Sequence, residues 1–273
     1  MRCAMPPTTP ERYAVVSCHV ERPLDDRVWA AFAALQERRP GGLAIAALMR
    51  PPDAVAGEHD DETWLRRARE AAARGPLGHH THFTSPTHAR PSGGDPGERV
   101  RREGAWLAER GVSPTLFCGG GWYTDRSVAR ACADLGYADC TPRTTRPPYL
   151  PPDAAWAELD SPARIEVDGS TLRAVPTSHG AGDLTRALAR PGLPLRVHAY
   201  FHDTDLVESR RRTLITAALA LLGMRRPATT LDAVAAGVGE DAPPVAWSDV
   251  ARGASTEGSA KRARGPHGSA GSP

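Results

Sequence analysis

Histidines are concentrated in one short segment of this sequence. Four of the ten lie between positions 79 and 88. His80 and His82 belong to residues 76–83, which we interpret as a strand. Because side chains alternate along a strand, these two imidazoles point to the same side, as two ligands of one divalent cation must. The pattern favours a metal or catalytic role over a chance cluster of solvated histidines.

A second polar group closes the first predicted strand, Tyr13–Val20. His19 and Glu21 are two residues apart and therefore share a direction, which suits a metal ligand or a base at a strand end. Asp25 and Asp26 follow within five residues of Glu21, and Asp26 is a further candidate carboxylate. In the alternative interpretation these are surface residues of a loop, with Asp25 as the N-cap of the next helix.

The last predicted strand, Leu195–Phe201, ends in residues suited to proton transfer. His198, Tyr200 and His202 share one face, and His202 stands at the carboxyl end with Asp205 nearby. An imidazole beside a carboxylate is the usual arrangement of a general acid or base. We interpret His198 as an interior histidine.

Three glycines and two aromatic residues follow the fourth predicted strand. Gly119, Gly120 and Gly121 permit close approach of a ligand to the backbone. Trp122 and Tyr123 suit stacking on a sugar ring or walling a pocket, although a flexible turn beside two core aromatics is the alternative. Patterns typical of phosphate-binding loops, serine hydrolases and dinucleotide-binding enzymes are absent from the sequence.

A sheet has to bring these strand ends together. The sequence predicts seven strands, over residues 13–20, 43–49, 76–83, 115–118, 137–141, 172–176 and 195–201. Helices are predicted over residues 25–38, 62–74, 96–110 and 125–135, between the first five strands. This alternation indicates an α/β fold, an incomplete (β/α)7 barrel of mostly parallel strands. Since barrel enzymes place their chemistry at the carboxyl ends of strands, we expect the polar groups above to line one cleft.

The composition indicates the domain organisation and argues against one class of partner. The 273 residues include 40% hydrophobic residues and carry a net charge of +2. We expect a disordered N-terminus at 1–10, one barrel domain at 11–251 and a disordered basic tail at 252–273. The tail holds four basic residues and one acidic residue, so the body is nearly neutral and nucleic-acid binding is not expected.

Neither a secretory signal nor a membrane-spanning segment is expected. The first ten residues hold no apolar signal-peptide core, and no apolar run approaches the roughly 20 residues that a membrane helix needs. We therefore expect a cytoplasmic protein. The five cysteines include no C-x-x-C pair, which argues against a disulfide framework and against a structural zinc site.

The order of these residues resembles the polysaccharide deacetylase (NodB-homology) superfamily, over roughly Tyr13 to Leu222. Residues 17–21 resemble the D-x-E form of that family's first motif, with His19 where Asp is expected. His80 and the threonine after it match the start of its H-[ST]-x-x-H motif, and Thr84 occupies the place of the second histidine. His82 and the loop residue His88 are the substitute ligands that the sequence offers.

Two later motifs complete the resemblance. Residues 118–123 keep the aromatic residues of the family's third motif and lose its Arg. Residues 200–202 look like the last motif, which supplies a histidine as general acid. The resemblance implies an incomplete barrel and a divalent metal, often zinc, used to remove acetyl groups from amino sugars or peptidoglycan.

The resemblance implies roles for particular residues. The expected metal ligands are Glu21, His80 and His82. The catalytic candidates are His202, His19, Asp26 and Asp205, and the substrate-binding candidates are Gly120, Trp122, Tyr123 and Tyr200. The implied function is a metal-dependent deacetylase that removes an N- or O-acetyl group from a carbohydrate or glycoconjugate, and we expect a hydrolase of C–N bonds. Two alternatives stay open: a non-catalytic carbohydrate-binding relative, and a metal-dependent hydrolase of other amides.

Overall fold

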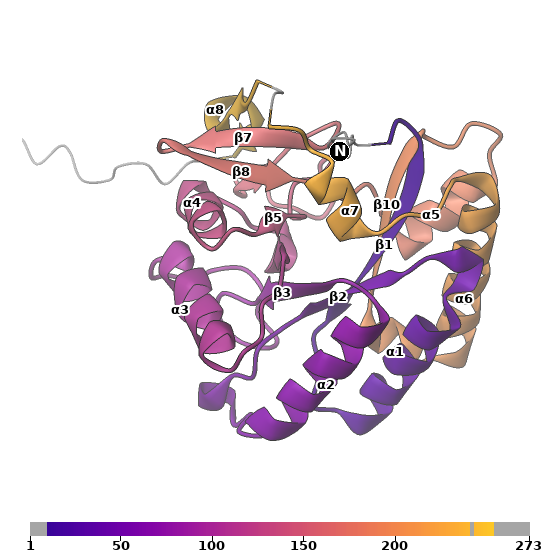
Figure 1. The fold of residues 1–273 in the computed structure, drawn as a ribbon, viewed down its shortest axis with the longest axis horizontal. Coiled ribbons are helices and arrows are strands. Elements are labelled where there is room, and N and C mark those ends of the chain that lie inside the picture. Colours follow the sequence, from indigo (N-terminus) through magenta and orange to yellow (C-terminus); the bar gives the residue numbers. More distant parts are fainter. Residues whose placement is uncertain (1–9, 241–242, 254–273) are drawn as a thin grey trace, which may run out of the picture.

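A curved, mostly parallel sheet organises the molecule (Figure 1). The computed structural model describes residues 10–240 and 243–253, so the expectations for residues 1–9 and 254–273 lie outside the described residues. Ten strands of the described chain form this sheet in the spatial order β11-β7-β8-β5-β4-β3-β2-β1-β10-β9. Their bounds are β1 Tyr13–Val20, β2 Ile45–Met49, β3 Leu77–Thr81, β4 Leu116–Gly119, β5 Ala138–Asp139, β7 Ala163–Val167, β8 Ser170–Ala174, β9 His179–Gly180, β10 Arg196–His202 and β11 Val245–Ala246.

The seven strands expected from the sequence are neighbours in this sheet. They run β8-β5-β4-β3-β2-β1-β10, and every pair among them is parallel. The predicted α/β fold with mostly parallel strands is therefore confirmed. No ladder between β8 and β10 closes a barrel within the described residues. Residues 175–178 alone connect β8 to β9, which pairs with β10, so the sheet curls far enough to bring these strands near one another.

One hairpin departs from the parallel pattern. β7 and β8 are antiparallel and pair Val167 with Ser170. The turn between them is Asp168-Gly169, and both residues have positive φ angles, 49° and 74°. A two-residue turn with this backbone matches the right-handed twist of the flanking strands.

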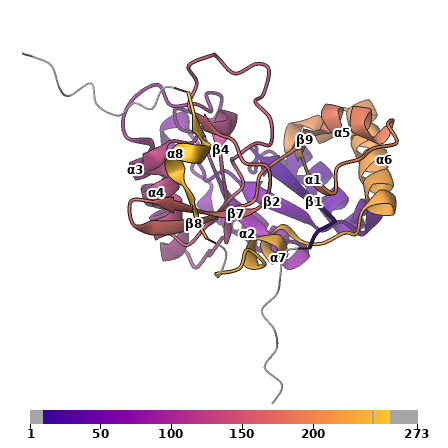
Figure 2. The ribbon, with the colours of Figure 1, turned by 90° about the horizontal axis from the view of Figure 1, so that it is seen from above.

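Most of the helices cover the outer face of the curved sheet. The four predicted helices are α1 Asp26–Arg38, α2 Asp61–Arg74, α3 Pro96–Glu109 and α4 Arg126–Asp134. Each is preceded by an aspartate whose side chain accepts hydrogen bonds from the first turn, and Asp25 is the cap of α1, as its alternative interpretation held. The others are α5 Ala181–Leu188, α6 Ser209–Arg225, α7 Leu231–Ala236 and α8 Trp247–Val250. In Figure 2, α1, α5 and α6 lie together on one side, and α3, α4 and α8 on the other.

Short elements complete the described chain. The 3-10 turns are η1 Pro40–Gly42, η2 Ala54–Ala56, η3 Gly120–Trp122 and η4 Asp203–Leu206. A separate two-stranded sheet pairs β6 Trp156–Ala157 with β12 Ala251–Arg252. Arg252 therefore belongs to the folded body, which corrects the expected start of the tail at residue 252.

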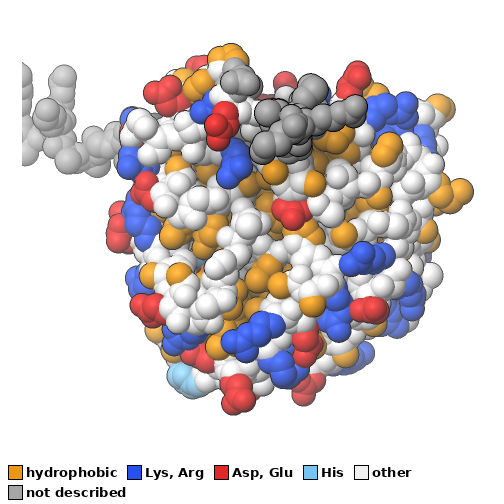
Figure 3. All heavy atoms as spheres, viewed as in Figure 1, with side chains coloured by type: hydrophobic (Ala, Val, Ile, Leu, Met, Phe, Trp, Pro, Cys, Tyr) orange, Lys and Arg blue, Asp and Glu red, His pale blue; other side chains and the backbone are white. Residues whose placement is uncertain are grey.

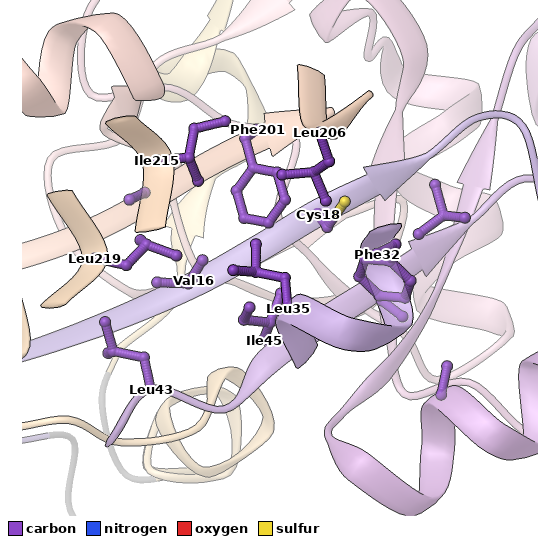
Figure 4. Close-up of a cluster of buried hydrophobic side chains, with 14 of the residues drawn as sticks. Val16, Cys18, Phe32, Leu35, Leu43, Ile45, Phe201, Leu206, Ile215 and Leu219 are labelled. Atoms are coloured by element: carbon purple, nitrogen blue, oxygen red, sulfur yellow. The ribbon is translucent and has the colours of Figure 1, made fainter. Parts of the chain in front are cut away.

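The core explains why one face of β1 is free for chemistry. Val16 and Cys18 of β1 pack with Phe32 and Leu35 of α1 and with Leu219 of α6 (Figure 4). Fully burying such apolar side chains stabilises the fold by roughly 1.5–3 kcal/mol each. Because neighbours along the strand alternate, the remaining residues of β1 face the interior of the curved sheet, and they lead to its carboxyl edge.

Acidic and basic side chains are interspersed on the face seen in Figure 3, so neither sign of charge dominates that face. Within residues 10–240 and 243–253, no helix combines the length and the apolar character needed to cross a membrane.

Candidate metal centre

Side chains from three strands meet at the carboxyl edge of the sheet. Glu21 follows β1, His80 and His82 lie at the end of β3, and His202 ends β10. The Glu21 Oε1 atom lies 3.3 Å from Nε2 of His82, 3.9 Å from Nε2 of His80 and 3.6 Å from Nε2 of His202. The structure thus brings all three expected metal ligands and one catalytic candidate into a single cluster.

His80 and His82 are each anchored through one ring nitrogen, and the other ring nitrogen of each has no partner. Nδ1 of His80 lies 2.8 Å from the Cys118 carbonyl oxygen, and Nδ1 of His82 lies 2.8 Å from that of Pro86. A carbonyl only accepts, so each Nδ1 carries the hydrogen and donates. Both Nε2 atoms are buried and have no hydrogen-bond partner. Metal-binding histidines are commonly anchored in this way through their other nitrogen.

The charges of the cluster suit ligands of a cation. Burial raises the pKa of Glu21, but the neighbouring imidazoles of His80 and His82 lower it more, so its pKa lies well below the usual range. Burial lowers the pKa of His80 to about 4, against the opposing effect of Glu21. At neutral pH the cluster therefore holds an ionised carboxylate facing a neutral imidazole, the protonation states that metal binding requires.

His19 lies beneath this cluster rather than at its mouth. Its ring centroid is 4.6 Å from that of His80 and 5.1 Å from that of His202, and its side chain is almost fully buried. Its Nε2 lies 3.5 Å from Sγ of Cys118. Burial above all, and then the neighbouring imidazoles, hold the pKa of His19 well below its usual value. A neutral, enclosed imidazole is a weak proton acceptor.

His202 is the most exposed of the four imidazoles, with 35% of its side chain accessible. Its Nδ1 is 3.8 Å from Oδ2 of Asp205, the carboxylate that also accepts from the His202 backbone N–H and pairs with Arg211. Burial lowers the pKa of His202, but Asp205 and Glu21 together raise it above its usual value. Beside it opens a pocket of about 420 Å³, walled in part by Tyr200 and Asp205.

Aromatic side chains form one wall of the cluster. Tyr200 stacks on His19 at 5.2 Å between centroids, and Trp122 meets Tyr200 edge to face at 4.7 Å. Trp122 adopts a left-handed backbone with φ 57°, and its Nε1–H donates to the Tyr149 hydroxyl at 2.5 Å. Arg143 packs against these rings, its guanidinium carbon 4.3 Å from the centroid of Trp122, and its Nε and Nη1 are buried without an acceptor.

Gly120 shapes the cluster through its lack of a side chain. A Cβ atom there would lie 2.8 Å from Cδ2 of His82 and 2.8 Å from the Thr81 carbonyl oxygen. This glycine is therefore needed for the close packing of η3 against His82.

Two candidates from the sequence do not join the cluster. Asp26 begins α1 with a 93% exposed side chain that pairs with Arg67. Tyr123 points to another part of the core, where it packs on Phe83 and donates its hydroxyl to Asp125. The loop alternative His88 is exposed.

His198 is an interior residue, as expected. It is buried, its ring nitrogens lie 2.9 Å from the Ser17 hydroxyl and 3.3 Å from the Thr177 hydroxyl, and burial lowers its pKa to about 3.

Sequence reasoning missed Arg143 and Tyr149 altogether. Both lie in the irregular, proline-rich segment after β5, where no periodicity indicates which side chains turn inward. The only available signal was position, since this segment follows a strand of the predicted barrel.

Comparisons with known proteins add little to this geometry. No family model matches the chain, and no curated protein matches it. Among solved structures, the 4-alpha-glucanotransferase from Thermococcus litoralis is similar with a TM-score of 0.48 and 11% sequence identity, over 81% of this chain and 38% of that one. The chain thus spans well under half of that enzyme, and a similarity at this level carries no argument about activity.

Proposed function

We propose that this protein is a divalent-metal-dependent deacetylase that hydrolyses an acetyl group on a carbohydrate or glycoconjugate. One observation carries the proposal: two buried imidazoles present unpartnered Nε2 atoms toward an ionised carboxylate, with a more exposed histidine at its side. Leaving two buried nitrogens unsatisfied costs stability, about 1–3 kcal/mol for each group. A bound cation would relieve that cost.

The residues present fit a cation. His80, His82 and Glu21 supply two nitrogens and one oxygen, the type of three-ligand set that leaves a further position open in catalytic zinc sites. A divalent cation held there lowers the pKa of bound water and polarises an acyl carbonyl. The anchored Nδ1 atoms of both histidines fix the direction of their Nε2 atoms before any ligand arrives.

His202 is the residue that we assign to proton transfer. It is the most exposed imidazole of the cluster, and Asp205 holds it by its backbone and favours its protonated form. As a general acid it protonates the leaving nitrogen when the acyl–nitrogen bond breaks. His19 is too enclosed for this task, and we assign it to supporting His80 and Tyr200.

The aromatic wall supports a carbohydrate as the substrate class. Trp122 and Tyr200 are rigidly held rings close to the candidate metal ligands. Pockets of this kind combine apolar walls with few polar groups that orient the ligand, and the apolar face of a sugar ring suits such a wall.

Metal content and acetate release test the proposal. The purified parent should contain one divalent ion per chain and release acetate from N-acetylated sugar oligomers. His80→Ala should lose both properties, whereas His88→Ala, a matched change in an exposed loop position, should keep them. An ion-free parent, or unchanged metal in His80→Ala, would refute the proposal.

A non-catalytic binding protein is the second candidate, favoured by the enclosure of His19 at the position where the resemblance expects a carboxylate base. It predicts that the protein binds sugar oligomers without releasing acetate. Release of acid from small amides, and not from sugars, would instead indicate the other amide hydrolase.

A further inference from the structure

A second set of metal-ligating atoms lies directly beneath the first. His19, His80 and Cys118 each offer one donor atom, and these three atoms all lie within 4.8 Å of one another. All three side chains are buried, with 4%, 1% and 0% exposure. β3 and β4 pair His80 with Cys118, and β1, which β2 separates from β3 in the sheet, supplies His19.

The spacing suits a tetrahedral ion. With bonds of about 2.0 Å to nitrogen and about 2.3 Å to sulfur, tetrahedral geometry separates the two donor atoms by about 3.5 Å. The Cys118 Sγ atom and the His19 Nε2 atom are 3.5 Å apart. The His80 and His19 rings are 4.6 Å apart, and the Nε2 atom of His80 is buried without a partner.

His80 is common to this set and to the cluster with Glu21 and His82. Its Nδ1 is occupied by the carbonyl oxygen of Cys118, so only Nε2 can bind a cation. One imidazole nitrogen serves one ion at a time. The two sets therefore exclude each other.

We propose that His19, His80 and Cys118 form a deep seat for a thiophilic metal ion, in competition with the upper seat of Glu21, His80 and His82. Two imidazoles and a thiolate favour softer ions, whereas the carboxylate of the upper seat favours harder ones. Binding forms a metal–sulfur bond, and the thiol proton of Cys118 is released to solvent. An ion in the deep seat removes His80 from the upper seat and so inhibits any activity there.

Cobalt spectroscopy distinguishes the two seats. Apo protein titrated with Co2+ without oxygen should bind one ion per chain and develop a thiolate-to-Co2+ charge-transfer band in the near ultraviolet. The band should survive in Glu21→Gln, which damages only the upper seat, and in Cys140→Ser, a control for a neighbouring buried cysteine. Cys118→Ser and His19→Gln should lack the band and still bind one Co2+ through the upper seat, which also shows that both variants are folded.

The outcomes separate this inference from the proposed function. A charge-transfer band in Cys118→Ser, or Co2+ bound without any band and lost in Glu21→Gln, would overturn the deep seat and leave the deacetylase proposal standing. A band without acetate release under any metal would overturn the deacetylase and leave the deep seat. Absence of Co2+ binding in the parent would overturn both.

Discussion

Replacing Gly120 by alanine tests whether His82 is a metal ligand. The new Cβ would lie 2.8 Å from Cδ2 of His82, 2.8 Å from the Thr81 carbonyl oxygen and 3.0 Å from Cβ of Ala89. An ordinary contact begins at 3.4 Å, so the closest pairs must separate by about 0.6 Å. The Thr81 oxygen belongs to the backbone of β3, and the His82 ring is the part that can yield.

A shift of this size matters because metal–ligand distances are held to about 0.2 Å. Gly120→Ala should therefore lower metal affinity about tenfold or more, which equals about 1.4 kcal/mol or more. The free energy of unfolding of the metal-free protein should fall by about 1–3 kcal/mol, as for other overpacked sites. Isothermal titration with Mn2+, a harder ion that favours the upper seat with its carboxylate, and urea denaturation measure the two effects.

Gly93→Ala is the matched control, because a Cβ there would meet no atom within 4 Å. It should leave both affinity and stability unchanged. If Gly120→Ala lost stability yet bound metal as tightly as the parent, His82 would not be a ligand.

Three further changes test the core and the buried charges. Phe32→Ala should cost roughly 3–5 kcal/mol in urea denaturation, since Phe32 is fully buried, whereas the 82% exposed Met224 should tolerate the same change. Burial raises the pKa of Asp139 to about 6, above its unfolded value of about 3.9. The protonated side chain therefore stabilises the fold at low pH, and this contribution is lost as pH rises through about 4 to 6. Asp139→Asn should remove this pH dependence from the free energy of unfolding. Arg143→Met should raise the free energy of unfolding by about 1–4 kcal/mol in urea denaturation, because it removes a buried charge whose Nε and Nη1 have no acceptor. A lower free energy of unfolding would show that stacking on Trp122 stabilises the fold more than desolvation of the charge destabilises it.

Long, regular elements could be predicted from the sequence. β1 has the predicted bounds, and the four helices after it begin and end within one residue of prediction. Their signals are local, because an aspartate cap and a buried apolar face depend on neighbours along the chain. β7 was missed although Asp168-Gly169 is a strong hairpin turn signal, since a five-residue strand at the sheet margin shows too little alternation to stand out.

The candidate site was predictable only where it follows strands. Glu21, His80, His82 and His202 stand at or just beyond the ends of β1, β3 and β10, so the rule that parallel strands end at one edge placed them together. Strand alternation could not tell that His19, although it shares a direction with Glu21, lies one layer deeper. That difference comes from Tyr200 and Trp122, which close over it from other elements.

Several unsatisfied polar atoms lie where the chemistry is proposed. Within the described residues, nine buried side-chain nitrogen or oxygen atoms have no hydrogen-bond partner, and four of them belong to His80, His82 and Arg143. Native proteins leave few such atoms, because each costs about 1–3 kcal/mol. The apolar cluster between the sheet, α1 and α6 supplies stability on the opposite face of β1, so one strand carries both the packing that holds the fold and the polar edge that destabilises it. A bound cation would satisfy the two histidines without any change in the core, and the metal-free protein should therefore be the less stable form.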